Sequence, residues 1–316
     1  MATMGREVRY CASEDGTQIA FCVEGRGPAL VICPYFFESF EKDDEAVLGW
    51  QDLLRQLGAG RQVVRYDMRG TGLSQRDAEI SHQANLRDLE AVVKAAGLQR
   101  FDLLGWAVGG AMAIEYAARH AGTVSGLVLY SCFATPTDVM PQDALRAFAA
   151  LCRTNWKLAS QTFADMSLRQ EASEIGLRVS DRLRQTMSGE VLATTLEFTF
   201  DLGELVRTIQ TPTLVLHRVD DSAIPFAASQ RLASLLPSAR LAPLKGSINY
   251  PALGDRQAPV DAIVSFLDAG REPPELDEVS ASQSRLRIIL FSDLAGHTAM
   301  MQRLGDERGR RAVARA

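Results

Sequence analysis

The sequence predicts an α/β fold with a mostly parallel sheet, because short apolar runs alternate with helical stretches through most of its 316 residues. The runs with the composition of buried strands are residues 29–33, 62–67, 127–130 and 213–217. Helical stretches are expected between them, at residues 84–96 and 111–119. Strands that alternate with helices form a parallel sheet, so we expect helices on both of its faces.

A strand, a tight turn and the start of a helix are expected over residues 101–110, whose sequence is FDLLGWAVGG. Gly105 and Gly109 match the outer glycines of the G-x-S-x-G frame, in which a sharp turn presents a nucleophilic serine. Ala107 stands at the serine position, and its methyl group cannot attack a carbonyl carbon. The segment therefore predicts a nucleophile turn that has lost its nucleophile.

Residues 7–269 resemble an α/β-hydrolase domain through three segments: residues 66–74, the turn around Ala107, and residues 217–221 followed by Pro225. The resemblance implies an eight-stranded, mostly parallel sheet flanked by helices, with a helical cap. It assigns residues 1–270 to this domain, with the cap at about residues 134–205.

The same resemblance places the catalytic acid at Asp221 and the catalytic histidine at the position of Asn249. The triad positions then hold Ala107, Asp221 and Asn249, and no intact triad is expected. An amide cannot take a proton from a nucleophile near neutral pH. Loss of two of the three groups favours a natural pseudoenzyme, and deliberate replacement of serine and histidine is the alternative. The histidines elsewhere are expected to be structural or solvated: His82, His120, His217 and His297.

Three consecutive aromatic residues follow the run at residues 29–33, and backbone donors at Tyr35 or Phe36 and at Val108 are expected to face the site. Two interpretations stay open: the rings pack between sheet and cap, or they line an apolar ligand pocket with Glu38, Ser39, Asp221 and Asn249 as sparse polar anchors. The residues expected to contact such a ligand are Tyr35, Phe36, Phe37, Glu38, Trp106, Ala107, Val108, Asp221, Asn249 and Tyr250.

Residues 134–205 interrupt the alternation of strands and helices, where the resemblance implies the cap. Helical stretches are expected at residues 142–155, 157–166, 167–183 and 190–196. Large apolar side chains come from Phe148, Trp156, Phe163, Met166, Phe198 and Phe200. A cap retained over an inactive site indicates that the cavity itself still matters; alternatively, the cap only covers apolar core.

Residues 271–285 have the composition of a linker, rich in proline, acidic residues and serine. An apolar run at residues 286–294 and a helical stretch at residues 298–308 follow it. This segment, with Asp293 at the end of the run, resembles the opening of a class III adenylate or guanylate cyclase catalytic domain. The resemblance implies that Asp293 holds Mg²⁺ against the phosphates of ATP in a complete cyclase domain. The alternative is a strand–helix appendage of the first domain.

These features together predict a catalytically silent, ligand-sensing region of a nucleotide cyclase, with residues 286–316 as the N-terminal fragment of the cyclase domain. A small apolar or amphiphilic molecule is expected under the cap, and the cyclase resemblance implies a homodimer through its segment. Whether this chain is itself an enzyme is left open, since it is expected to be inactive as a hydrolase and too short for cyclase activity. The alternatives are a serine esterase or related hydrolase inactivated by replacement, and a ligand-free dimerisation scaffold.

The composition limits the other functions. A net charge of −5 argues against general nucleic-acid binding. The five cysteines show no metal-ligand spacing, and no signal peptide is evident, which predicts a reducing cytoplasmic location. No apolar run reaches the length of a membrane-spanning helix.

We expect this chain to bind Mg²⁺–ATP poorly, because a class III cyclase needs a second metal-binding aspartate and Asp293 alone cannot hold two metal ions. Calorimetric titration with Mg²⁺ and ATP measures this directly. Micromolar affinity would contradict the expectation.

Overall fold

The computed structural model describes residues 7–36, 39–40, 49–168 and 173–269. The chain divides into two units, Met1–Gly270 and Arg271–Ala316, and every described residue belongs to the first. The predicted ligand contacts Phe37 and Glu38 lie outside the described residues, as do the linker, Asp293 and the rest of residues 286–316. What was expected of those segments stays a prediction.

An eight-stranded sheet forms the centre of the described unit, in the order β1-β2-β4-β3-β5-β6-β7-β8. All neighbouring strands from β4 through β8 in this order pair in parallel, while β2 pairs antiparallel with both β1 and β4. The strands are β1 (Arg9–Ala12), β2 (Gln18–Gly25), β3 (Ala29–Cys33), β4 (Gln62–Tyr66), β5 (Phe101–Trp106), β6 (Val124–Tyr130), β7 (Thr213–Arg218) and β8 (Ala239–Leu244). The predicted fold class, a mostly parallel sheet, is confirmed.

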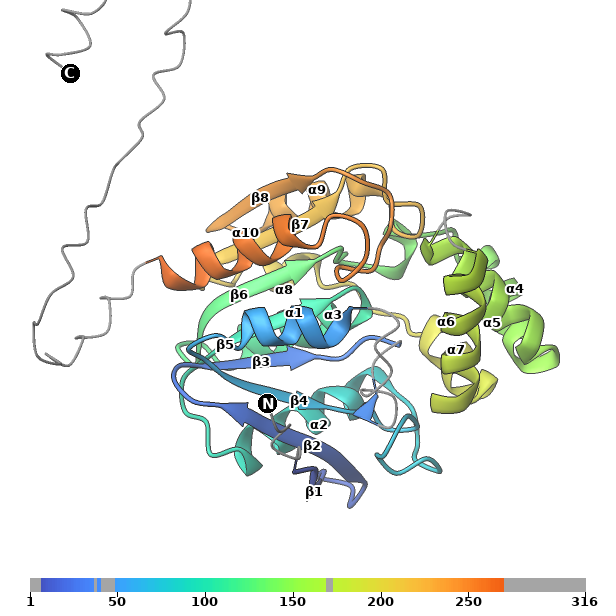
Figure 1. Ribbon diagram of the computed structural model, residues 1–316, viewed down its shortest axis with the longest axis horizontal. Coiled ribbons are helices and arrows are strands. Elements are labelled where there is room, and N and C mark those ends of the chain that lie inside the picture. The colour runs from blue at the N-terminus through green and yellow to red at the C-terminus, as the bar shows by residue number, and fades with distance from the viewer. Residues whose placement is uncertain (1–6, 37–38, 41–48, 169–172, 270–316) are drawn as a thin grey trace, which may run out of the picture. The chain divides into compact units, whose positions relative to one another are not determined.

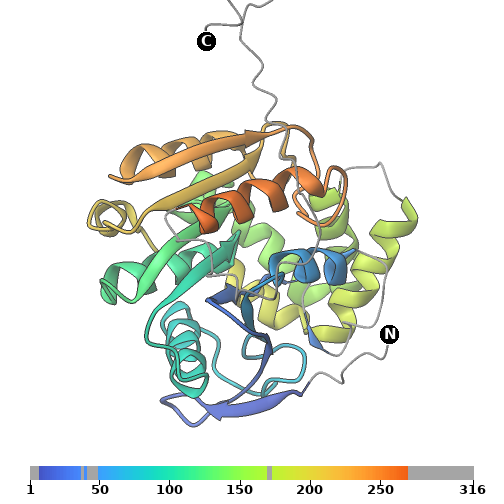
Figure 2. The same ribbon diagram turned by 60° about the vertical axis from the view of Figure 1, so that its left-hand side comes forward.

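Continuous burial explains why the central strands were recognisable in the sequence. Every residue of β3, β5 and β7 is buried, as expected of a parallel sheet covered on both faces. Helices α1 (Trp50–Leu57) and α10 (Gln257–Asp268) cover one face. The helices on the opposite face are α2 (His82–Ala95), α3 (Val108–Arg119), α8 (Gly203–Val206) and α9 (Phe226–Leu235) (Figures 1 and 2). Each face therefore has its own apolar core.

The cap is inserted between β6 and β7 and lies at the carboxyl ends of the parallel strands (Figure 1). A short 3₁₀ helix, η3 (Pro136–Asp138), precedes it. Its helices are α4 (Gln142–Thr154), α5 (Trp156–Leu168), α6 (Ser173–Thr186) and α7 (Gly189–Leu196). The four predicted helical stretches match these elements closely, except that Ser167 was expected to start the third helix and instead belongs to the end of α5. The core beneath α1 and α10 continues into the cap.

Three glycines allow α3 to approach the strands closely. A Cβ atom on Gly105 would lie 2.6 Å from the Cα of Gly110, and one on Gly110 would lie 2.2 Å from the Sγ of buried Cys132. A Cβ atom on Gly109 would lie 2.7 Å from the carbonyl oxygen of Pro34. The glycine frame is thus required by backbone packing, whichever residue stands at its centre.

Gly110→Ala should destabilise the protein by roughly 1–3 kcal/mol, because the added methyl overlaps the buried sulfur of Cys132. This loss outweighs the gain in helix propensity, which is about 1 kcal/mol in a helix interior. Gly176→Ala in α6 is the matched control, since its new Cβ would meet only side-chain atoms at 3.4 Å or more, and it should be neutral or stabilising. Urea unfolding followed by circular dichroism compares the two, and equal stabilities would contradict the packing argument.

Candidate functional site

Ala107 occupies a strained turn between β5 and α3. Its backbone has φ 48° and ψ −118°, a conformation that residues other than glycine rarely adopt. Its N–H donates to the carbonyl oxygen of Tyr130 at 3.0 Å, and its own carbonyl accepts from the N–H of Gly110 at 2.9 Å. Strain of this kind costs of order 1–3 kcal/mol and is concentrated at functional sites. The turn that presents a nucleophile is therefore kept, although an alanine stands in it.

Asp221 lies in the turn after β7, and its side chain is fully buried. Oδ1 accepts from the backbone N–H groups of Ala223 and Ile224 at 2.9 and 3.1 Å. Oδ2 accepts from the hydroxyl of Ser131 at 3.1 Å and from Nδ2 of Asn249 at 2.6 Å. The amide of Asn249 thus meets the carboxylate at the position where the resemblance places the catalytic histidine. The carboxylate therefore meets four neutral donors.

His217 lies beside this carboxylate and is also fully buried. Its Nε2 lies 3.2 Å from Oδ2 of Asp221 and 2.9 Å from the carbonyl oxygen of Ile224. Its Nδ1 lies 2.7 Å from the hydroxyl of Ser229. Both ring nitrogens are thus engaged within the fold, and His217 does not line the cavity described below.

The two other described histidines are also held in structural contacts. Nε2 of His82 lies 2.6 Å from Oε2 of Glu115, and Nε2 of His120 lies 3.0 Å from Oε1 of Glu90. Neither ring lines the cavity. Among the described residues, no histidine therefore takes the place that Asn249 holds in the sequence.

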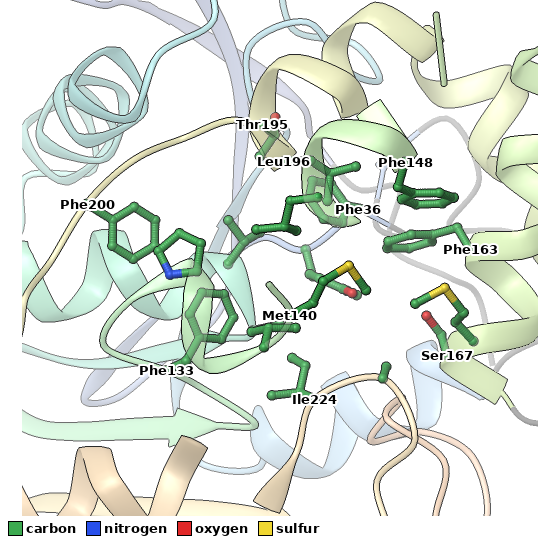
Figure 3. Close-up of a pocket in the computed structure, with 18 residues that line it drawn as sticks. Phe36, Phe133, Met140, Phe148, Phe163, Ser167, Thr195, Leu196, Phe200 and Ile224 are labelled. Carbon is green, nitrogen blue, oxygen red and sulfur yellow. The ribbon is translucent and has the colours of Figure 1, made fainter. Parts of the chain in front are cut away.

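A cavity lies between the cap and the strand ends, and Ala107 forms part of its wall (Figure 3). It contains about 750 Å³ of space outside protein atoms, part of it open to solvent. Four predicted contacts line it: Tyr35, Phe36, Ala107 and Val108. The remaining described lining residues are Phe133, Pro136, Val139, Met140, Leu145, Phe148, Phe163, Met166, Ser167, Thr195, Leu196, Phe200, Ala223 and Ile224.

The cavity wall is almost entirely apolar. Phe148 and Phe163 stack with ring centroids 6.4 Å apart on the cap side, while Phe133 and Phe200 stack at 6.2 Å (Figure 3). Its 18 described lining residues include no charged side chain. The walls thus suit a hydrocarbon or aromatic ligand body.

Four other predicted contacts are placed behind the wall and not in it. Trp106, Asp221, Asn249 and Tyr250 are buried, and none is among the described lining residues. The ring of Trp106 lies 4.6 Å from that of Tyr35 and 5.0 Å from that of Tyr250, so it supports the wall from behind.

Ser39, predicted to be a polar anchor, is also directed elsewhere. Its hydroxyl donates to Oδ2 of Asp67 at 3.3 Å, and Ser39 is not among the described residues that line the cavity.

Two serines at this site were not predicted from the sequence. Ser131 has φ 51°, the second such value outside glycine among the described residues, and its hydroxyl donates to Asp221. Ser167 is hydrogen-bonded through its hydroxyl to that of Tyr35, and its carbonyl accepts from the N–H of Asn249 at 3.1 Å. Neither serine belongs to a sequence motif, so only the folded arrangement reveals them. The backbone hydrogen bond of Ser167 therefore connects the cap to the loop that carries Asn249.

No group of three or more histidine, cysteine, aspartate or glutamate side chains within the described ranges is arranged to hold a metal ion. In the same part of the chain, no helix combines the length and apolar character needed to cross a membrane.

The sheet, the strained turn after β5 and the inserted cap together define an α/β-hydrolase fold. Residues 49–244, more than half of the chain, match the family model of the serine aminopeptidases S33. The chain therefore belongs to this family.

Relatives in three organisms show the breadth of this likeness. The chain is 24% identical over 234 residues to pyrrolizixenacetamide deacetylase of Xenorhabdus hominickii, covering 71% of this chain and 85% of the relative. It is 27% identical to a non-heme haloperoxidase of Rhodococcus erythropolis, covering 82% and 99%. The crystal structure of the esterase RhEst1 from Rhodococcus sp. ECU1013 superposes with a TM-score of 0.70 at 25% identity, covering 83% of this chain and 98% of that chain.

Asp221→Ala should lower the free energy of unfolding by about 3 kcal/mol, because it leaves four buried donors without their charged acceptor. Asp220→Ala, one residue earlier in the same turn, is the control, because Asp220 is exposed and should tolerate the change within about 0.5 kcal/mol. Chemical unfolding of both variants measures the difference. If both variants were as stable as the parent, the carboxylate would not organise this site.

Proposed function

We propose that this chain is a catalytically silent member of its family, which binds a small apolar or amphiphilic molecule in the cavity under the cap. The observation that carries the proposal is the placement of Ala107, at the strained turn and in the cavity wall at once. Because the packing of α3 against the sheet already imposes this turn, the turn alone does not indicate use of the site, and the apolar cavity beside it is what supports ligand binding.

The chemistry of the neighbouring groups supports the absence of hydrolysis. A methyl group at residue 107 cannot form an acyl-enzyme. The carboxylate of Asp221 binds the amide of Asn249, which cannot relay a proton as an imidazole does. The names of the relatives, a deacetylase, a haloperoxidase and an esterase, are those of enzymes, and they support descent from an active one.

The N-terminal end of α3 supports ligand binding at this site. Val108 is the first residue of α3 and lines the cavity. The first N–H groups of a helix have no acceptor within the helix, and they carry the positive end of its dipole. A ligand carbonyl or hydroxyl oxygen can accept from this end of α3, as an oxyanion would in an active relative.

We further infer that the ligand regulates a class III adenylate or guanylate cyclase domain that begins near residue 286, with Asp293 as a metal-binding residue and the cyclase segment as the dimer contact. The support is the resemblance of residues 286–308 to the opening of that domain. Mg²⁺ and ATP would be needed only by the complete domain. Cyclase assays on a longer chain that carries this domain, with and without ligand, test this part of the proposal.

The unmodified chain should show no saturable turnover of p-nitrophenyl esters, because residues 107 and 249 provide neither nucleophile nor base. A spectrophotometric assay at high protein concentration measures this. A rate that saturates with substrate and survives repurification would overturn the proposal.

The double variant Ala107→Ser with Asn249→His separates the proposal from its first alternative, a serine hydrolase inactivated by replacement. A natural pseudoenzyme should remain slow, because the rest of its site has not been selected for turnover. Recovery of kcat to the range usual for enzymes, of order 10 s⁻¹, would favour the alternative. Ligand-induced thermal stabilisation of the unmodified chain excludes the second alternative, a ligand-free scaffold.

A further inference from the structure

Two hydroxyl-bearing residues, Tyr35 and Ser167, form a polar part of the cavity wall. The hydroxyls of Tyr35 and Ser167 are hydrogen-bonded to each other, and both residues line the cavity. The ring of Tyr35 is fixed by Trp106 at 4.6 Å and by Phe36 at 4.8 Å, measured between centroids. A ligand oxygen that reaches this part of the wall therefore meets rigid, neutral hydroxyl groups.

The negative charge of Asp221 acts on this hydroxyl pair. Burial raises the pKa of Tyr35 well above its usual range, and the negative charge of Asp221 raises it further. Like charges repel. The carboxylate of Asp221, which opposes ionisation of Tyr35, therefore also opposes the binding of an anionic ligand group next to Tyr35. Four of its hydrogen-bond donors are neutral backbone, amide and hydroxyl groups, and Nε2 of His217 lies 3.2 Å from its Oδ2. The described ion-pair neighbour of Asp221 is His217, which does not line the cavity.

The cavity wall offers no compensation for a ligand anion. Its 18 described residues include neither lysine nor arginine nor histidine. Moving a carboxylate from water into an apolar site without a paired cation is far costlier than moving a neutral hydroxyl group. The walls therefore favour neutral ligands, and the hydroxyl pair provides them with a hydrogen-bond partner.

We propose that this cavity selects an uncharged ligand, with an apolar body against the phenylalanine rings and one neutral oxygen-bearing group at the hydroxyl pair of Tyr35 and Ser167, and that it rejects the carboxylate of the same size. Alcohols, ketones, amides and intact esters belong to the accepted class, and carboxylic acids at neutral pH to the rejected one. This inference rests on the proposed function, because it names the ligand class of the same site.

The matched probes are 1-octanol and octanoate, which share an eight-carbon chain and differ in the charge of the end group. Calorimetry at pH 8, where octanoate is ionised, should give at least tenfold tighter binding of the alcohol. Equal or tighter binding of octanoate would overturn the inference while leaving the proposed ligand-binding function intact. Binding of neither probe, nor of any other neutral ligand, would count against both.

Asp221→Asn tests the origin of the selectivity. An asparagine keeps an acceptor for the N–H groups of Ala223 and Ile224 and removes the charge. The Oδ1 atom of Asn249 has no hydrogen-bond partner among the described residues, so the amide of Asn249 can turn to accept from the new asparagine. The preference for octanol should then fall severalfold.

Asp220→Asn, which removes an exposed charge from the same turn, should leave the preference unchanged. An unchanged preference in both variants would show that Asp221 does not set the selectivity. If Asp221→Asn does not fold, the comparison of the two probes on the unmodified chain still decides the ligand class.

Discussion

The close contact of α3 with the sheet is the constraint on which the site depends. Gly105 and Gly110 leave no room for a Cβ atom between strand and helix, and Gly110 presses against the buried sulfur of Cys132. Because of this contact, α3 begins only one residue after β5 ends. The backbone therefore reverses direction at Ala107 alone, which has φ 48°. The strained turn and the position of Val108 in the cavity wall follow from this packing.

The polar groups around Asp221 show how a buried carboxylate is stabilised in this scaffold without a histidine at residue 249. A carboxylate buried in the fold needs donors, and here they are the backbone of Ala223 and Ile224, the hydroxyl of Ser131 and the amide of Asn249. An amide meets the hydrogen-bonding need of this carboxylate but cannot carry out proton transfer. Meeting the hydrogen-bonding need of this carboxylate and transferring a proton are therefore separate requirements, and Asn249 meets the first.

The sequence predicts the buried parts of the fold better than the edges, and the reason is physical. Strands β3 and β7 are buried at every residue and were visible as apolar runs, while β5, equally buried, was predicted as the strand before the turn at Ala107. The edge strands β1 and β8 were missed because solvent reaches much of each, with Tyr10 56% exposed and Pro243 interrupting the pattern of β8.

At the site, the pairing of Asp221 with Asn249 could be predicted from motif positions. The roles of Ser131 and Ser167 could not, because these residues meet the site only through tertiary packing. The predicted contacts were also divided by the fold: Tyr35, Phe36, Ala107 and Val108 line the cavity, whereas Trp106, Asp221, Asn249 and Tyr250 lie behind it. Ligand contact by the first group stays a prediction, and for the second group the structure indicates a supporting position.

The most direct test of the account is mass spectrometry of small molecules released from the purified chain, compared with a Val139→Trp variant. Val139 is partly exposed and lines the cavity, so a larger side chain there should fill the space without disturbing the sheet. The account predicts that an uncharged molecule is recovered from the unmodified chain and is depleted in the variant. Recovery of the same molecule in equal amounts from both, or of a covalently attached acyl group, would contradict it.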